Sequence, residues 1–132
     1  MSVNILIISH TGIGTMLTQT AQHIFARDLP LIITNADIDE DTDPDKIIPR
    51  LTRILQQLDQ GDGVLILTDI VGATPYNVAS TLAKTTNITT KLISGLNLPM
   101  LLRVLNYPEK NLIELAKTTL EGGQQGIMEC KK

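Results

Sequence analysis

The sequence contains very few aromatic residues: no tryptophan, one phenylalanine and two tyrosines among 132 residues. Proteins that bind nucleic acid bases stack them on aromatic side chains, and sugars would also find few flat faces here. The 11 lysine and arginine residues are outnumbered by 14 acidic ones, and they form no cluster before Lys131 and Lys132. A formal net charge of −3 argues against nucleic acid as a partner. The group that this protein handles is therefore expected to be small or anionic.

Cysteine and long apolar runs are also scarce. Cys130 is the single cysteine, so the chain can form no internal disulfide, and no cysteine or histidine accompanies it at metal-ligand spacing. No apolar run approaches the roughly 20 residues that cross a membrane, and the N-terminus lacks the basic and apolar segments of a signal peptide. The sequence thus predicts a cytoplasmic protein that is not inserted into a membrane and needs neither a metal nor an organic cofactor.

Apolar residues follow a strand-then-helix pattern along the whole chain. The length and a hydrophobic content of 42% fit a single domain, residues 1–132, with a buried core. Continuous apolar runs predict buried strands, and apolar residues at helical spacing predict helices. The expected strands are 3–9, 31–36, 64–67 and 90–94, and the expected helices are about three turns after Gly14, then 47–58, 75–85, 99–105 and 108–120.

Three prolines mark expected helix boundaries. Asp43 before Pro44 is a candidate helix start, and Pro49 predicts that the regular second helix begins or is kinked at that residue. Thr74 before Pro75 is typical of an N-cap followed by the first helical residue. The alternation as a whole predicts an α/β fold: a doubly wound, mainly parallel sheet with helices on both faces and a possible antiparallel edge strand at 127–130.

Two polar residues stand where buried strands end. His10 ends the first strand and Asp69 follows the third. If these strands are neighbours, as in a flavodoxin-like order, both side chains emerge at the carboxyl edge of the sheet, where such folds bind ligands. A carboxylate that accepts the Nδ1 hydrogen of an imidazole fixes its tautomer and leaves Nε2 free as a base or nucleophile. The pair predicts a histidine that attacks phosphorus.

A phosphoryl group also needs hydrogen-bond donors for its oxygens. Helix N-termini offer free backbone N–H groups, and two are expected at this edge: one at Gly12 and the other at Gly72, Ala73 and Thr74. The Thr74 hydroxyl could add a further donor if capping leaves it free. These residues are the predicted phosphoryl-binding groups.

Four segments together resemble one family. His10, the pair Thr68-Asp69, the turn 72–77 (GATPYN) and the segment 95–100 (GLNLPM) resemble the mannose-family enzyme IIA (EIIA) domain of the bacterial phosphoenolpyruvate:sugar phosphotransferase system (PTS). The resemblance covers essentially the whole chain. It implies that His10 accepts a phosphoryl group from phospho-HPr and passes it to an EIIB protein in sugar uptake, with Asp69 supporting the ring. It also implies a homodimer that exchanges its C-terminal edge strands, here 127–130.

The sequence departs from the family pattern at two places. Thr11 stands between His10 and Gly12, where the family usually has His-Gly, and Ala73-Thr74 replaces the usual Gly-Ser. Thr74 keeps the hydroxyl, so the expected chemistry survives. No Pro/Ala-rich linker and no IIB domain follows in this sequence, so the acceptor is expected to be a separate protein or to be absent.

Other functions stay open. One is a regulatory EIIA of an incomplete PTS without a permease, and another is the phosphoryl-donor subunit of dihydroxyacetone kinase. A nucleotide-binding module is disfavoured because Leu17 stands where its third glycine belongs. The acidic run 37–45 is expected to be a solvated loop without a metal, and His23 an exposed helix residue. Asn97 and Pro99 either shape a turn or line the site.

Overall fold

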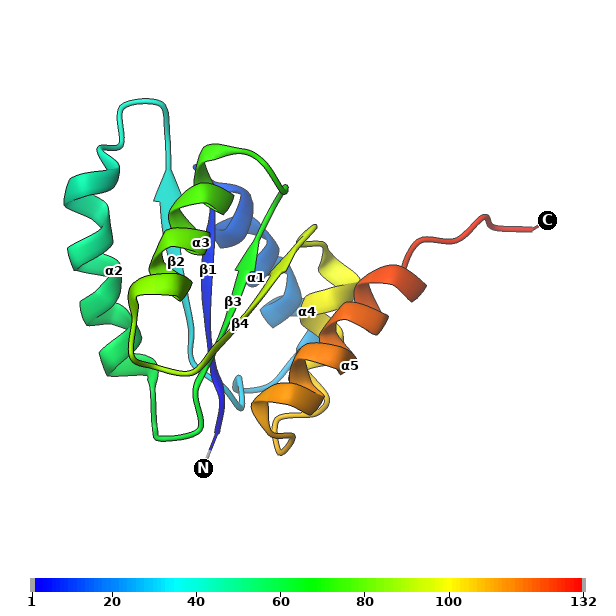
Figure 1. The fold of residues 1–132 in the computed structure, drawn as a ribbon. Coiled ribbons are helices and arrows are strands. Elements are labelled where there is room, and N and C mark those ends of the chain that lie inside the picture. The colour runs from blue at the N-terminus through cyan, green and yellow to red at the C-terminus, as the bar shows by residue number, and fades with distance from the viewer. Residues whose placement is uncertain (1, 132) are drawn as a thin grey trace.

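The computed structural model describes residues 2–131, which alternate between strands and helices (Figure 1). The strands are β1 (Asn4–His10), β2 (Ile33–Ile38), β3 (Val64–Thr68) and β4 (Thr90–Ser94). The helices are α1 (Ile13–Phe25), α2 (Pro44–Leu58), α3 (Thr74–Thr85), α4 (Leu98–Leu105) and α5 (Leu112–Gln125). The α/β fold expected from the sequence is confirmed.

The four strands form one parallel sheet in the order β2-β1-β3-β4. The strand order reverses between β1 and β3, so these two strands are neighbours, as expected for a flavodoxin-like arrangement. Ile8 of β1 is in register with Thr68 of β3, and His10 is in register with Ile38 of β2. His10 and the residue that follows Thr68 therefore meet at the carboxyl edge of the sheet.

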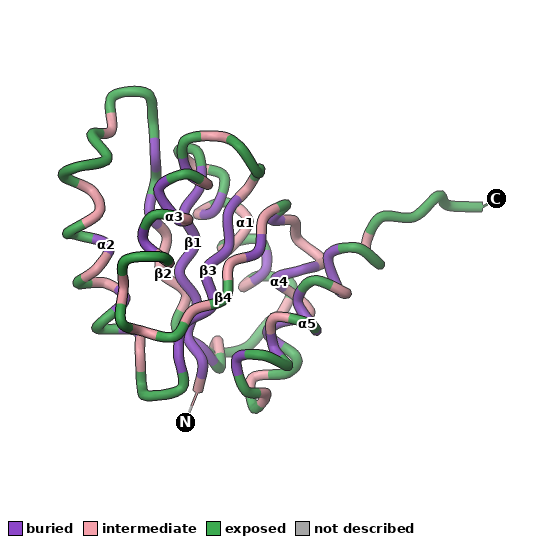
Figure 2. Tube along the Cα trace, viewed as in Figure 1, coloured by how far each residue is buried: buried purple, intermediate pink, exposed green. Residues whose placement is uncertain are grey.

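Helices cover both faces of the sheet, because its central strands are apolar on both sides (Figures 1 and 2). Ile5 and Ile7 pack with α1, α4 and α5 on one face, whereas Leu6 and Ile8 pack with α2 and α3 on the other. Side chains alternate along a strand, so His10 shares the face of Leu6 and Ile8. The side chain of His10 thus belongs to the α2 and α3 side.

Pairing with β1 moves the second strand along the sequence. It was expected at 31–36 but spans Ile33–Ile38, because its register with β1 runs from Ile5↔Ile33 to His10↔Ile38. Leu31, expected in the strand, is buried in the core just before it. The polar residue Asp37 lies inside the strand because backbone pairing, not side-chain polarity, fixes the end of β2.

α2 does not begin at Pro49; it begins at Pro44, the start that the Asp43-Pro44 pair predicted. The helix begins at Pro44, where the carboxylate of Asp43 accepts the Asp45 N–H at 3.0 Å as an N-cap. It continues through Pro49, whose missing N–H removes one bond of the second turn. The apolar stripe that was expected to pack on the sheet does so through Leu51, Leu55 and Leu58.

The N-cap of α3 also differs from expectation. Thr74 is the first helical residue, and the N-cap is Ala73, which has no side chain that could cap. The Thr74 hydroxyl therefore does not cap its own helix.

The last helix starts and ends later than expected. It was predicted at 108–120 but spans Leu112–Gln125, with the Asn111 side chain accepting the Glu114 N–H at 3.0 Å. Gly122 and Gly123 predicted the end of the helix, yet both lie inside it, and Gly126 is the C-cap. Glycine is required inside the helix because α4 packs closely against α5. A Cβ on Gly122 would lie 2.7 Å from Cγ of Arg103. Close helix packing, rather than a turn, accounts for this glycine.

Beyond α5 the described chain, residues 127–131, is exposed, extends away from the domain and pairs with no strand of the sheet (Figure 1). The possible edge strand at 127–130 is thus not formed within a single chain. No helix within residues 2–131 is long and apolar enough to cross a membrane.

Candidate functional site

His10 and Asp69 are in direct contact at the carboxyl edge of the sheet. Nδ1 of His10 lies 2.6 Å from Oδ2 of Asp69, a short hydrogen bond of the kind that forms between charged or strongly polarised groups. The same oxygen accepts the backbone N–H of His10 at 3.1 Å. The carboxylate thus holds both the ring and the backbone of the histidine, which is the pairing that the sequence predicted.

The two side chains differ in exposure. The imidazole is 51% exposed, whereas the carboxylate is only 12% exposed. Oδ1 of Asp69, its second carboxylate oxygen, accepts the Ile70 backbone N–H at 3.1 Å. The partly buried carboxylate is therefore fixed by three hydrogen bonds, and it presents the ring to solvent.

The electrostatics of the pair favour an ionised aspartate. Burial raises the pKa of the Asp69 carboxyl, but hydrogen bonds from the His10 ring and from backbone N–H groups, together with the charge of His10, lower it by more. The net pKa is below its usual range. An ionised Asp69 accepts a hydrogen bond from Nδ1–H, and this assigns the proton of a neutral ring to Nδ1 and the lone pair to Nε2.

A small hollow of about 160 Å³ opens beside the ring. Besides His10 it is lined by Ile38, Asp39, Glu40, Thr74 and Pro75. From the sequence, the acidic run 37–45 was expected to be a solvated loop, and Asp39 and Glu40 were not expected beside the histidine. Strand order could have predicted their position, because β2 pairs with β1 and its carboxyl end therefore brings the residues after Ile38 to the same edge as His10.

Of the expected phosphoryl-binding groups that follow the third strand, Thr74 lies beside the histidine. Gly72 and Ala73 form the turn between β3 and α3, and Thr74 starts α3 and lines the same hollow as His10. Thr74 is exposed, and its hydroxyl is not used as an N-cap. Backbone N–H groups in the first turn of a helix have no partner within that helix, so this turn can receive an anion.

The first turn of α1 is already engaged by the chain itself. The Gly12 N–H is directed at Oδ1 of Asp37 at 3.4 Å, and the Gly14 N–H bonds Oγ of the buried Ser9 at 3.0 Å. Ser9 and His10 are neighbours on β1, so Ser9 faces α1 while His10 faces α3. Of the two helix N-termini expected to bind the phosphoryl group, that of α3 lies on the side of the imidazole.

Gly14 has a packing role that the sequence did not reveal. A Cβ at this position would lie 2.7 Å from Cγ2 of Ile7 and 3.0 Å from Oγ of Ser9. The first turn of α1 therefore rests directly on β1, one residue before His10. Only the contact between helix and strand could have shown this.

Three other residues considered in the sequence, His23, Asn97 and Pro99, lie outside the contact between His10 and Asp69. His23 is exposed on α1, as expected. The Asn97 side chain accepts the Met100 N–H at 3.0 Å as the N-cap of α4 and donates to the Gly123 carbonyl at 3.1 Å. Pro99 lies against Gly126. Asn97 and Pro99 therefore shape the contact between α4 and α5.

Known proteins share this fold and sequence pattern. Residues 4–119 match the model of the family described as EIIA-man, PTS system fructose IIA component. The mannose-specific EIIAB component of the PTS from Escherichia coli is 26% identical over 133 residues, which cover 99% of this chain and 40% of that protein. The chain thus spans less than half the length of the curated relatives that it matches.

Solved structures agree with the fold. A mannose/sorbose-specific IIA subunit from Enterococcus faecalis has a TM-score of 0.86 and 23% identity, with 100% of this chain and 97% of that one covered. An EIIA component from Streptococcus agalactiae has a TM-score of 0.81 and 22% identity, with 96% of each chain covered. Because the family model extends over most of the sequence, the chain belongs to the EIIA-man family of phosphotransferase system components.

Proposed function

We propose that this protein is a phosphohistidine carrier that accepts a phosphoryl group from phospho-HPr on His10 and passes it to an EIIB protein in sugar uptake. The observation that carries the proposal is the 2.6 Å bond between Nδ1 of His10 and Asp69, combined with the exposure of the ring. The bond holds Nδ1 and leaves Nε2 as the nucleophile. The proposal places the protein in the cytoplasm.

The transfer needs no added reagent. The lone pair of Nε2 attacks phosphorus, the new N–P bond forms, and the N–P bond of the donor phosphohistidine breaks and returns its electron pair to the donor imidazole. The proton on Nδ1 stays in the bond to Asp69, so the phosphorylated ring carries a positive charge that the carboxylate offsets. Transfer to the acceptor is the same step in reverse on a second partner.

Positioning and hydrogen-bond donors provide the remaining catalysis. A loose phosphoryl-transfer transition state spreads charge over three equatorial oxygens, which donors at the site can stabilise. We assign these donors to the turn of Gly72, Ala73 and Thr74, with the Thr74 hydroxyl free to bond. Gly12 would contribute only after its N–H leaves Asp37, to which it is directed at 3.4 Å.

The proposal extends to a homodimer in which the C-terminal segments are exchanged. β4 is an edge strand of the sheet, and residues 127–131 extend away from their own domain. Ile127 and Met128 are 78% and 72% exposed, which suits a segment that packs on a second copy. Light scattering of the full chain and of a form ending at Gly126 tests this: we expect a dimer that becomes monomeric on truncation, and a monomeric full chain would contradict it.

Intact-mass spectrometry tests the carrier function directly. The protein is incubated with phosphoenolpyruvate, enzyme I and HPr, and we expect one acid-labile phosphoryl group per chain. Removing HPr should prevent the modification. Folded protein that stays unmodified in the complete mixture would reject the proposal, and addition of a purified EIIB protein would show whether the group moves onward.

A further inference from the structure

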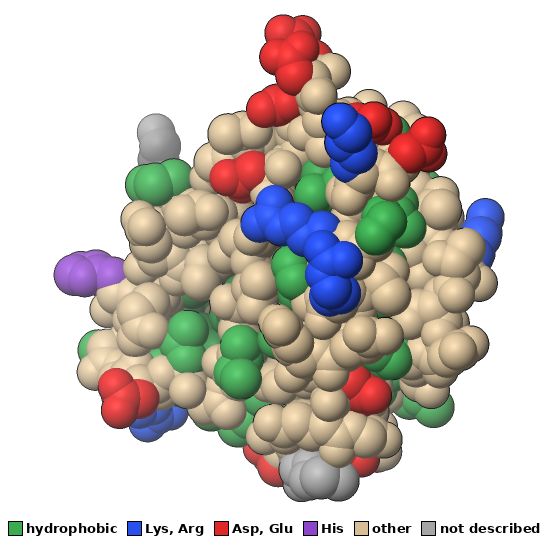
Figure 3. Space-filling view, turned by 90° about the vertical axis from the view of Figure 1, so that its left-hand side faces the viewer, with side chains coloured by type: hydrophobic (Ala, Val, Ile, Leu, Met, Phe, Trp, Pro, Cys, Tyr) green, Lys and Arg blue, Asp and Glu red, His purple; other side chains and the backbone are tan. Residues whose placement is uncertain are grey.

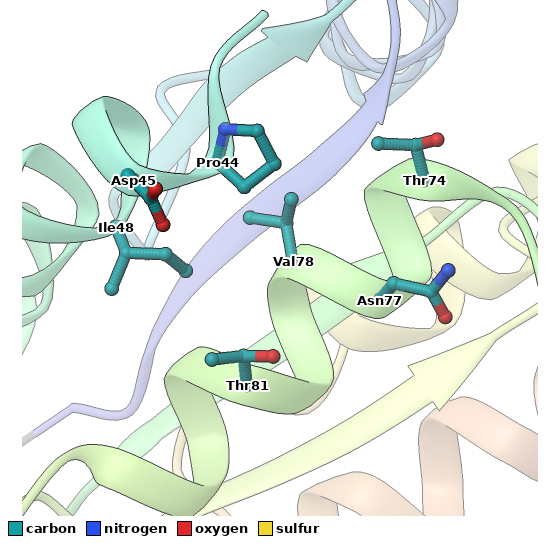
Figure 4. A pocket seen from close by; sticks show the side chains of 7 residues that line it. All are labelled: Pro44, Asp45, Ile48, Thr74, Asn77, Val78 and Thr81. Carbon is teal, nitrogen blue, oxygen red and sulfur yellow. The ribbon is translucent and has the colours of Figure 1, made fainter.

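A groove of about 340 Å³ lies between α2 and α3, next to the site (Figure 4). Its apolar part is formed by Pro44 and Ile48 of α2 and by Val78 of α3. Farther along, these helices close over the core through Leu51 and Leu82. The groove is open where the two helices begin, at the carboxyl edge of the sheet (Figure 4). Its size falls in the range of small-ligand pockets.

Polar groups line the groove above its apolar floor. Asp45 comes from α2, and Thr74, Asn77 and Thr81 come from α3 (Figure 4). Within residues 2–131 the one ion pair of the structure is His10–Asp69, so the Asp45 carboxylate has no cationic partner. Capping of α2 is done by Asp43, which leaves the Asp45 carboxylate available.

The positive charges of α2 face elsewhere. Lys46, Arg50 and Arg53 are exposed, and at about 100° per residue they lie about 140–160° around the helix from Ile48 and about 80–140° from Asp45. Seen from the α2 side, several Asp and Glu side chains lie at the top of the molecule with one Lys or Arg side chain beside them, while other Lys and Arg side chains cross its middle (Figure 3). Among residues 2–131, the one charged group that lines the groove is the Asp45 carboxylate.

The groove adjoins the hollow beside His10. Thr74 lines both, and the hollow adds the carboxylates of Asp39 and Glu40. A protein that reaches the ring of His10 therefore also meets the opening of the groove. An occupant that fits the groove has an aliphatic stem that packs on Ile48 and Val78 and a positively charged head that binds the Asp45 carboxylate.

We propose that the groove receives a lysine or arginine side chain from the protein that docks on His10. The proposal rests on the proposed phosphoryl-carrier function, since that function brings a protein to this edge. The stem of the side chain packs on Ile48 and Val78, as long cationic side chains do on apolar surfaces. Its head bonds the Asp45 carboxylate.

A first experiment examines the groove without any phosphoryl transfer. ¹⁵N-labelled protein is titrated with N-acetyl-arginine methylamide and, separately, with the neutral citrulline analogue at millimolar concentrations. We expect the arginine probe to shift the amide signals of Asp45, Ile48, Asn77 and Thr81, and the citrulline probe to shift them much less. Equal shifts with both probes, or none with either, would overturn the proposal.

Three variants sharpen this titration. Asp45→Asn should weaken arginine binding about threefold or more, as expected for a charge pair near the surface. Thr81→Arg should abolish arginine binding, because Thr81 lines the groove and the introduced guanidinium would occupy it. Asp62→Asn is the control: it changes the net charge equally but removes an exposed carboxylate from the turn before β3, at the other end of the sheet.

A second experiment identifies the source of the cationic side chain. Initial rates of His10 phosphorylation are measured against phospho-HPr concentration. In Asp45→Asn we expect KM to rise about three- to tenfold with kcat unchanged, and added salt to shrink the difference from wild type. Asp62→Asn should behave as wild type, and a KM in Asp45→Asn equal to that control would reject the docking role.

The two experiments separate this proposal from the carrier function. If phospho-HPr does not phosphorylate the wild type, the carrier function fails, and the probe titration still decides whether the groove selects a cation. If phosphorylation proceeds and both Asp45→Asn results match the control, the groove proposal fails and the carrier function stands.

Discussion

Oδ2 of Asp69 accepts two hydrogen bonds from His10, one from Nδ1 at 2.6 Å and one from the backbone N–H at 3.1 Å. One oxygen thus fixes both the rotation of the ring and the end of β1 that carries it. The ring cannot turn its Nε2 away without breaking the shorter bond. This contact is the structural basis of the first three predictions.

His10→Ala should abolish phosphoryl acceptance while leaving the fold intact, because the side chain is half exposed and supports no core contact. His23→Ala is the matched control, since His23 is an exposed histidine on α1. Intact-mass spectrometry after complete phosphorylation, with circular dichroism for folding, makes the measurement. A phosphoryl group on folded His10→Ala would move the acceptor to another residue.

Asp69→Asn should slow phosphorylation of His10 by about 100-fold or more, since an amide can no longer fix the tautomer or offset the charge of the phosphorylated ring. Single-turnover rates with excess phospho-HPr measure the transfer step itself. Asp62→Asn serves as the control for the lost charge. Rates within a factor of two of wild type would remove Asp69 from the mechanism.

Stability should depend on pH through Asp69. The pKa of this carboxyl is lowered in the folded state, so its contribution is present above the unfolded pKa of about 3.9 and is lost as the pH falls through the lower folded value. The difference in free energy of unfolding between wild type and Asp69→Asn should therefore be larger at neutral pH than near pH 3, as measured by urea denaturation.

The His10→Ala background provides the control for this pH dependence. Without the ring bond, the folded pKa of Asp69 rises toward its ordinary value, so the difference caused by Asp69→Asn should vary less with pH. The same pH dependence in both backgrounds would show that the ring does not lower the pKa.

Thr74→Val should reduce the rate of phosphoryl transfer about ten- to 100-fold if the hydroxyl donates to the phosphoryl group. Thr74→Ser should keep most of the rate. Thermal stability should change little in either variant, because Ala73 is the N-cap and Thr74 is exposed. Equal rates for the valine and serine variants would assign the phosphoryl contacts to the backbone of the turn alone.

Gly14→Ala should destabilise the protein by about 1–3 kcal/mol, the usual cost of overpacking. The added Cβ would collide with Oδ1 of Asn35 on β2 and lie 2.7 Å from Cγ2 of Ile7 on β1, so α1 would have to move away from both strands. Gln19→Ala, at an exposed position on the same helix, should change stability by less than about 0.5 kcal/mol. Chemical denaturation compares them, and equal stability would show that α1 can shift without cost.

The sequence by itself determined which segments form strands and helices and where His10 and Asp69 stand along them. Apolar runs located β1, β3 and β4, and the placement of His10 and Asp69 at strand ends predicted their meeting. These features depend on the periodicity of apolar residues, which can be recognised from residues close together in the sequence. The resemblance to the EIIA family rested on the same segments and is confirmed by the family match.

Tertiary structure decided the rest, because it depends on contacts between distant residues. Pairing with β1 shifted β2 to Ile33–Ile38 and brought Asp39 and Glu40 beside the imidazole. Close packing on α4 let α5 run through its glycines, where local propensity predicts an end. The N-terminus of α3 lies on the same side of the sheet as the His10 ring, because side chains alternate along β1 and α3 covers the face to which His10 belongs. Sequence periodicity fixes elements, whereas register and packing fix which side chains meet.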